Sequence, residues 1–168
     1  MNINLRPLKK EDRTTLAHLA NNKKIWDKLM DRIPFPYAVE DADFFIDLKG
    51  KDDPLSTFAI VDETDEFLGV ISLELKNDIY RFNAELGYWI GEPHWGKGIA
   101  TKAIALITKF GFETLDLNRI YACVFEGNDA SMHVLVKNGY EKEAVLKNSV
   151  HKNGIYLNEH VFVNFKKG

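Results

Sequence analysis

Residues 84–101, AELGYWIGEPHWGKGIAT, decide the fold of this 168-residue chain. Residues 84–90 alternate between two faces, which is the pattern of a strand. Two glycines follow, Gly96 and Gly98, and an apolar helical pattern then runs from Ile99 to about Thr114. The stretch therefore predicts a strand, a glycine loop and a helix in direct succession.

The glycine loop has the local chemistry of an anion site. Glycine adopts positive φ without strain and lets a ligand approach the main chain closely. The first N–H groups of a helix lack partners within the helix, and the helix dipole favours a negative charge there. Lys97 and Lys102 add positive charge nearby. The loop predicts a phosphate or pyrophosphate cradle, and taken alone it is equally compatible with a plain turn.

Two nucleotide motifs match the loop only in part. Gly91 to Lys97 fits the beginning of a P-loop, but Gly98 stands where the magnesium-binding Ser or Thr belongs. Thr101 stands where a dinucleotide fingerprint has its third glycine. Both mismatches count against a nucleotide-binding protein.

Outward from this stretch, the periodicities predict a mixed α/β (α+β) domain with about seven strands and about four helices. The predicted strands cover 2–6, 56–62, 67–76, 84–90, 119–124, about 140–150 and 157–166. The predicted helices cover 10–22, 39–48, 99–114 and 128–138. The strands at 56–90 suggest an antiparallel meander, and 152–154 a turn.

Composition limits the class of protein. The length fits one domain over 1–168, with 45% hydrophobic and 28% charged residues. The net charge of −3 gives no overall attraction to nucleic acid or to a membrane surface. Cys123 is the only cysteine, and the start has no long apolar stretch, so we expect a cytoplasmic protein. The histidines lack zinc-ligand spacing, so no metal is expected.

Four stretches in order resemble the GNAT superfamily of acyl-CoA-dependent N-acetyltransferases: 84–91, 94–103, 128–131 and 135–140. The sequences Tyr88-Trp89-Ile90 and Trp95-Gly96-Lys97-Gly98 look like those of its RimJ/RimL branch, which includes ribosomal-protein N-terminal acetyltransferases. The resemblance covers essentially the whole chain. It implies a mostly antiparallel sheet that is splayed in the middle, and direct acetyl transfer from acetyl-CoA to an amine without an acyl-enzyme.

The resemblance also implies binding residues. The family's pyrophosphate motif falls on Trp95, Gly98 and Ala100, with Trp95 in place of the usual Arg or Gln. The strand before the loop offers its main chain to the pantetheine arm, with an N–H near Ile90 polarising the thioester carbonyl. The implied CoA-binding residues are Trp89, Ile90, Gly91, Trp95, Gly96, Lys97, Gly98, Ile99, Ala100, Thr101, Asn128 and Ser131.

Catalytic roles fall on Ser131 and Glu85. Asn128 is either the N-cap of the next helix or a partner of the pantetheine arm. Many relatives have a tyrosine acid seven residues later, where this chain has Leu135, so we expect Ser131 to assist the departing sulfur. Glu85, on the strand ahead of the splay, is the candidate base, acting directly or through water, and its position is equally compatible with a solvent-facing strand carboxylate. Cys123 alternates with apolar neighbours and is interpreted as core.

The acceptor is expected to be a primary amine. A peptide α-amine, with a pKa near 7.7–8.0, is already about a tenth neutral at pH 7, whereas a lysine amine is almost entirely charged. The alternatives are a small-molecule amine or a non-catalytic module that binds acyl-CoA. Acceptor specificity is expected to lie in 23–40 and the final hairpin loop, in a monomer or homodimer.

Overall fold

Seven strands form one sheet in the computed structural model, which describes all residues from 1 to 168. In chain order, the strands are β1 (Ile3–Arg6), β2 (Thr57–Asp62), β3 (Phe67–Leu75), β4 (Asn83–Ile90), β5 (Arg119–Phe125), β6 (Glu141–Lys152) and β7 (Ile155–Phe165). Their order in the sheet is β1-β2-β3-β4-β5-β7-β6. Every neighbouring pair is antiparallel except β4 and β5, so the predicted mixed, mostly antiparallel sheet is confirmed.

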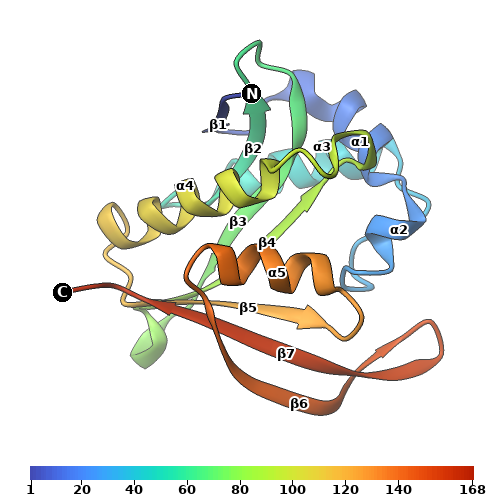
Figure 1. The fold of residues 1–168 in the computed structure, drawn as a ribbon. Coiled ribbons are helices and arrows are strands. Elements are labelled where there is room, and N and C mark those ends of the chain that lie inside the picture. Colours follow the sequence, from blue (N-terminus) through green and yellow to red (C-terminus); the bar gives the residue numbers. More distant parts are fainter.

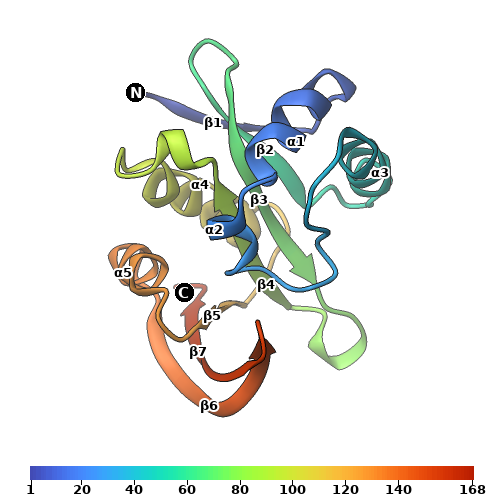
Figure 2. The same ribbon diagram turned by 90° about the vertical axis from the view of Figure 1, so that its right-hand side faces the viewer.

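Helices cover both faces of the sheet (Figures 1 and 2). They are α1 (Arg13–Ala20), α2 (Lys23–Trp26), α3 (Val39–Lys49), α4 (Ile99–Glu113) and α5 (Asp129–Lys137). Figure 2 shows α4 and α5 on one side and α1 and α3 on the other. Two apolar clusters hold these layers together, one under α4 and one under α1 and α3. The sheet is therefore buried on both faces near its centre.

The sheet opens between β4 and β5. Their parallel pairing covers only Asn83 to Glu85 on β4 and Arg119 to Tyr121 on β5. β4 continues to Ile90 without a partner on that side, while β5 stays paired with β7 up to Phe125. The predicted splay is thus present, and it begins one residue after Glu85.

Several predicted boundaries change. The helix predicted over 10–22 is a 3₁₀ turn, Lys10–Asp12, followed by α1, and a separate turn of helix follows as α2. Asn22 starts α2 because its side chain accepts from the N–H groups of Lys24 and Ile25. The one-turn α2 has too few residues for periodicity, which is why four helices were predicted and not five. β6 also runs two residues further than predicted, to Lys152.

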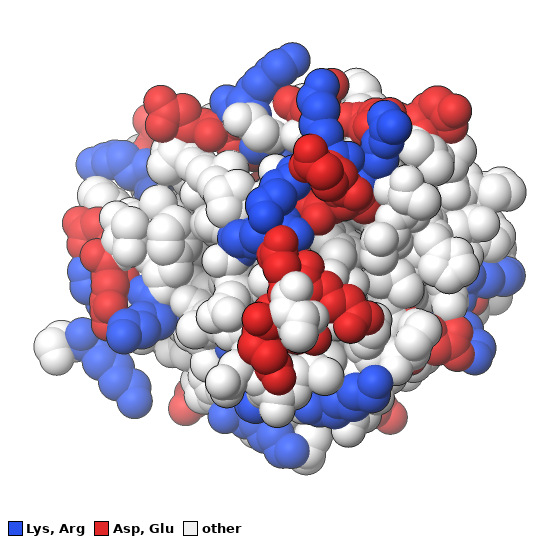
Figure 3. All heavy atoms as spheres, turned by 90° about the horizontal axis from the view of Figure 1, so that it is seen from above, with Lys and Arg blue, Asp and Glu red and all other residues white.

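The surface is mixed in charge. Figure 3 shows Lys and Arg interspersed with Asp and Glu on one face, without a broad field of either sign. The longest helix, α4, has 15 residues, and no helix is both long and apolar enough to cross a bilayer.

Candidate active site

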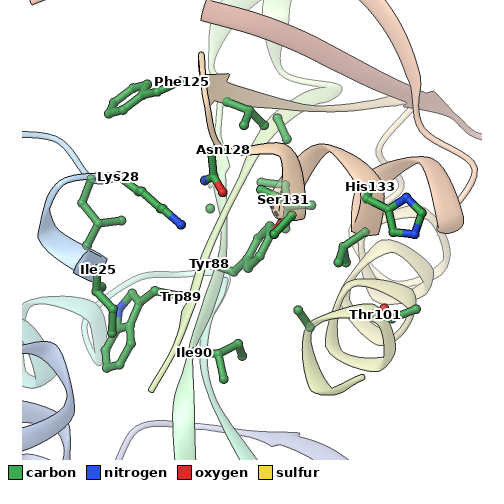
Figure 4. Close-up of a pocket in the computed structure, with 18 of the residues that line it drawn as sticks. Ile25, Lys28, Tyr88, Trp89, Ile90, Thr101, Phe125, Asn128, Ser131 and His133 are labelled. Carbon is green, nitrogen blue, oxygen red and sulfur yellow. Dashed lines mark hydrogen bonds between the residues drawn. The ribbon is translucent and has the colours of Figure 1, made fainter. Parts of the chain in front are cut away.

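A cavity of about 570 Å³ occupies the opening between β4 and β5. Its walls come from β4, β5, the glycine loop, the starts of α4 and α5, and residues 25–30 (Figure 4). The predicted site residues that line it are Glu85, Trp89, Ile90, Trp95, Gly96, Gly98, Ile99, Ala100, Thr101, Asn128 and Ser131. Gly91 and Lys97 do not line it.

The glycine loop presents a row of free N–H groups. No main-chain N–H from Gly96 to Thr101 donates a hydrogen bond within the protein. Gly96 and Gly98 have φ of 74° and 73°, and a Cβ at either position would meet nothing within 4 Å. The row starts at Gly96 because the N–H of Trp95 already donates to the carbonyl of Glu92. Six free donors in open space make a good anion site.

β4 presents only alternate main-chain groups to the opening. The N–H of Gly91 donates to the carbonyl of Leu68 on the β3 side, 2.9 Å away. Because strand hydrogen bonds alternate in direction, Trp89 shares this orientation, and Tyr88 and Ile90 point their N–H and C=O groups toward the opening. Of the three residues predicted to pair with a ligand arm, only Ile90 has that orientation.

The Trp95 side chain already contacts this open edge. Its indole Nε1 donates to the carbonyl oxygen of Ile90 at 2.7 Å. The ammonium of Lys28 lies 5.6 Å from the centre of the Trp95 ring. Figure 4 shows Lys28 pointing into the cavity, toward Asn128.

Two hydroxyl groups meet on the opposite wall. The Tyr88 hydroxyl lies 2.5 Å from Oγ of Ser131 on α5. On β4, Tyr88 shares a face with Leu86 and Ile90, a pattern that by itself indicates a core residue. The structure shows instead that its half-buried side chain reaches the cavity. Asn128 makes no side-chain cap, so its amide is free to face the cavity (Figure 4).

Glu85 lies in a cluster of polar groups at the bottom of the opening. Its carboxylate is 3.4 Å from the ammonium of Lys76 and 3.4 Å from the hydroxyl of Tyr121. Glu159 on β7 also lines the cavity, and burial together with the charge of Glu85 raises its pKa. Sequence reasoning missed Glu159, because the carboxylate of Glu85 that it faces comes from a different strand.

Cys123 is half-buried and lines the same cavity, which corrects its interpretation as a core residue. Burial and the carboxylates of Glu85 and Glu159 raise the pKa of its thiol to about 12. The thiol is therefore protonated at neutral pH and is a poor nucleophile.

A second cavity, of about 420 Å³, lies against the other face of β4. It shares six lining residues with the first: Leu29, Met30, Glu85, Gly87, Tyr88 and Trp89. Its charged lining residues are Arg32, Lys49, Asp52, Asp53, Glu74 and Glu85, so acids outnumber bases. The two cavities meet at Glu85 and at residues 29–30. Residues 29–30 lie within 23–40, where acceptor specificity is expected.

The amino-acid sequence is similar to those of known proteins. Residues 2–141 match the acetyltransferase (GNAT) domain family. Spermidine N(1)-acetyltransferase of Escherichia coli (strain K12) is 31% identical over 93% of this chain and 82% of its own length. The uncharacterized N-acetyltransferase YoaA and the putative ribosomal N-acetyltransferase YdaF, both of Bacillus subtilis (strain 168), are 37% and 36% identical over 100 and 88 residues. Those matches span about half of each relative, 56% and 48%.

The fold is shared with solved structures. Mycobacterium smegmatis RimJ in complex with CoA-disulfide superposes with a TM-score of 0.85 at 22% identity. The superposition covers 97% of this chain and 81% of RimJ.

Proposed function

The chain belongs to the GNAT family of N-acetyltransferases, and we propose that it transfers the acetyl group of acetyl-CoA directly to a cationic primary amine. The observation that carries this proposal is the meeting of two cavities at Glu85. One cavity has six free N–H groups at its end, and the other is rich in carboxylates.

The diphosphate of CoA fits the glycine loop. The N–H groups of residues 96–101 have no partner in the protein, and both glycines leave room for phosphate oxygens. Each helix-end contact is worth about 0.3–1 kcal/mol, so several are needed for useful affinity. Lys97 has no partner and adds charge, whereas Lys102 is bonded to the carbonyl of Met1.

The pantetheine arm fits along β4. The main-chain groups of Tyr88 and Ile90 face the opening, and the Asn128 amide faces it from the other wall. An amide arm laid between them pairs with β4 as an added strand. The N–H near Ile90 then lies by the thioester carbonyl, where it stabilises the negative charge that develops on attack.

The residues at the junction provide acid and base. The neutral amine forms the new C–N bond, and Glu85 accepts its proton directly or through water. The C–S bond breaks, and the thiolate takes a proton from the hydroxyl pair of Ser131 and Tyr88. The acetyl group moves to the amine, the proton of the amine moves to Glu85, and CoA leaves with a proton from the hydroxyl pair. A proton released from Glu85 and passed through solvent restores that pair for the next turnover.

Two acceptor classes fit the acidic cavity. A protein N-terminus, as in the RimJ/RimL branch, fits because an α-amine needs little deprotonation. A polyamine fits because Asp52, Asp53 and Glu74 line the second cavity, and the spermidine acetyltransferase relative covers most of the chain. Assays with acetyl-CoA and either spermidine or a peptide with a free N-terminal serine separate these classes.

The donor site is tested by an isosteric pair. Gly98→Asp places a carboxylate among the free N–H groups, and Gly98→Asn places a neutral group of the same size; both residues tolerate positive φ. We expect calorimetry to show at least a hundredfold loss of CoA affinity for Asp and less than about tenfold for Asn. Equal affinities in the two variants would refute the placement of the diphosphate.

Activity is tested separately from binding. Release of free thiol from acetyl-CoA in the presence of an amine supports transfer, whereas CoA binding without thiol release identifies a non-catalytic module. A thermal-shift comparison of acetyl-CoA, ATP and NADH excludes a nucleotide-binding protein if only acetyl-CoA stabilises the fold.

A further inference from the structure

Lys152 is the one buried residue of β6, a strand that is otherwise largely exposed. It ends the strand at the tip of the β6–β7 hairpin and is only 3% exposed. Burying an ammonium is costly unless other groups compensate its charge. The groups around the Lys152 ammonium must therefore compensate its charge.

Two groups of the segment 23–33 surround the Lys152 ammonium. Its Nζ lies 3.4 Å from the centre of the Trp26 ring and 2.7 Å from a carboxylate oxygen of Asp31. The neighbouring Asn153 donates from its side chain to Asp27 at 2.8 Å. The hairpin tip and the segment are more than 100 residues apart in the chain, so these contacts fix a tertiary arrangement.

Trp26 connects the two ends of the segment 23–33. Its indole Nε1 donates to the carbonyl of Ile33, which closes the turn, and its ring packs on Phe35 at 5.6 Å. At its beginning, Asn22 and Lys24 both bond to the carboxylate of Glu92, beside the glycine loop. The segment is thus held at one end by Glu92 and at the other by the hairpin tip.

The held segment forms a wall of both cavities. Ile25 and Lys28 line the donor cavity, Arg32 and Ile33 line the acceptor cavity, and Leu29 and Met30 line both. A shift of the segment changes the width of the passage where donor and acceptor meet.

We propose that Lys152 is a positioning residue that sets acceptor specificity: clamped between Trp26 and Asp31, it fixes the wall shared by the two cavities. This inference rests on the proposed function, because it assigns the second cavity to the acceptor. Lys152 lines neither cavity and touches no reacting atom.

The test uses three variants of the full chain. Lys152→Met removes the charge and keeps most of the volume, and Lys152→Arg keeps the charge. Lys147→Met, at an exposed position of the same strand, is the matched control. Replacing a buried charge by an apolar side chain is often neutral for stability, so we expect all three to fold. Asp31→Asn weakens the clamp from its exposed side and serves if Lys152→Met does not fold.

Hydrogen exchange provides a readout that needs no turnover. Amides 26–33 should exchange at least about fivefold faster in Lys152→Met than in the unchanged protein and the Lys147→Met control. With spermidine, or with the N-terminal serine peptide, the acceptor KM should rise about fivefold or more while kcat changes less than about twofold. In Lys152→Arg, the exchange rate of amides 26–33 and the acceptor KM should both stay close to those of the unchanged protein.

The outcomes separate the two proposals. Unchanged exchange and unchanged acceptor KM in a folded Lys152→Met protein overturn the positioning role. Absence of turnover on both acceptors in the unchanged protein refutes the proposed function, and the exchange result still decides whether Lys152 holds the segment. CoA affinity should stay within about threefold, because the bonds of Asn22 and Lys24 to Glu92, beside the glycine loop, are untouched in Lys152→Met.

Discussion

The hydroxyl oxygens of Tyr88 on β4 and Ser131 on α5 lie 2.5 Å apart across the opening of the sheet. Burial raises the pKa of Tyr88, and the bond to Ser131 opposes that rise only in part. The phenol therefore keeps its proton throughout the neutral range. The resemblance predicts a tyrosine acid at position 135, where this chain has Leu135, and Tyr88 brings a phenol to the cavity from the sheet.

Ser131→Ala should lower turnover far more than it lowers donor affinity. Proton transfer to a leaving group contributes about 10²–10⁴-fold, so removing the donor should cut kcat by about tenfold or more. The CoA dissociation constant should change less than about twofold, because the loop amides are untouched. Single-turnover thiol release and calorimetry measure the two quantities, and a normal kcat would remove Ser131 from the mechanism.

Tyr88→Phe tests whether the two hydroxyls act as a unit. If they do, Tyr88→Phe should show a similar loss of kcat, and the double variant should lose little more than the worse single variant. Losses that multiply in the double variant would show two independent roles. Thermal melting of each variant distinguishes this result from unfolding.

Trp95→Phe should strengthen CoA binding. The indole N–H occupies the carbonyl of Ile90, which is the group that β4 offers to the arm. Phenylalanine keeps a ring and leaves that carbonyl free, and a hydrogen bond is worth about 0.5–1.5 kcal/mol net. Calorimetry should therefore show an affinity about twofold to tenfold higher. Weaker binding would mean that the indole N–H is needed while the ligand is in place.

The fold was largely predictable because its signals are local. Alternation over 67–76 and 84–90 identified β3 and β4, and the apolar period from Ile99 identified α4. The one-turn helix α2 was not predictable by period, because its start depends on the Asn22 side chain. Strand order was also beyond local signals, since the parallel contact of β4 with β5 depends on pairing across the chain.

The candidate site was predictable where the main chain determines it and less so where side chains meet. The glycine loop pointed to the main-chain N–H groups of residues 95–101; the structure leaves those of 96–101 without an internal partner, whereas the N–H of Trp95 donates to Glu92. Periodicity could assign Tyr88 to a face of β4 but could not reveal that this face opens into a cavity. Glu159 and Lys152 were missed because their neighbours come from distant elements.

Cys123 should react slowly although it lines a cavity. With a pKa of about 12, its thiolate fraction at pH 8 is roughly a thousandfold below that of a free cysteine. Iodoacetamide labelling of the folded protein at pH 8 should therefore be at least about a hundredfold slower than labelling in guanidinium. Labelling at the rate of glutathione would contradict the raised pKa and reopen the possibility of an acyl-enzyme.

Arg6→Ala should destabilise the fold, because Arg6 joins β1 to the start of α1. Its guanidinium forms two bonds of 2.8 Å to Asp12, whose side chain is only 6% exposed and also accepts from the N–H of Lys9. Removing the cation leaves a buried carboxylate without its main partner. A fully buried pair broken in this way loses about 3–5 kcal/mol, and the partial exposure of Arg6 reduces this to about 2–3 kcal/mol.

Arg13→Ala is the matched control for that loss, because Arg13 also pairs with an aspartate, Asp43, but both side chains are largely exposed and 3.5 Å apart. Exposed pairs contribute about 0–1 kcal/mol, since water screens them in the folded protein. The midpoint temperature of thermal unfolding should therefore fall by about 5–10 °C for Arg6→Ala and by no more than about 2–3 °C for Arg13→Ala. Equal shifts would show that the Arg6–Asp12 pair contributes no more than a surface contact, and that apolar packing alone holds β1 against the core.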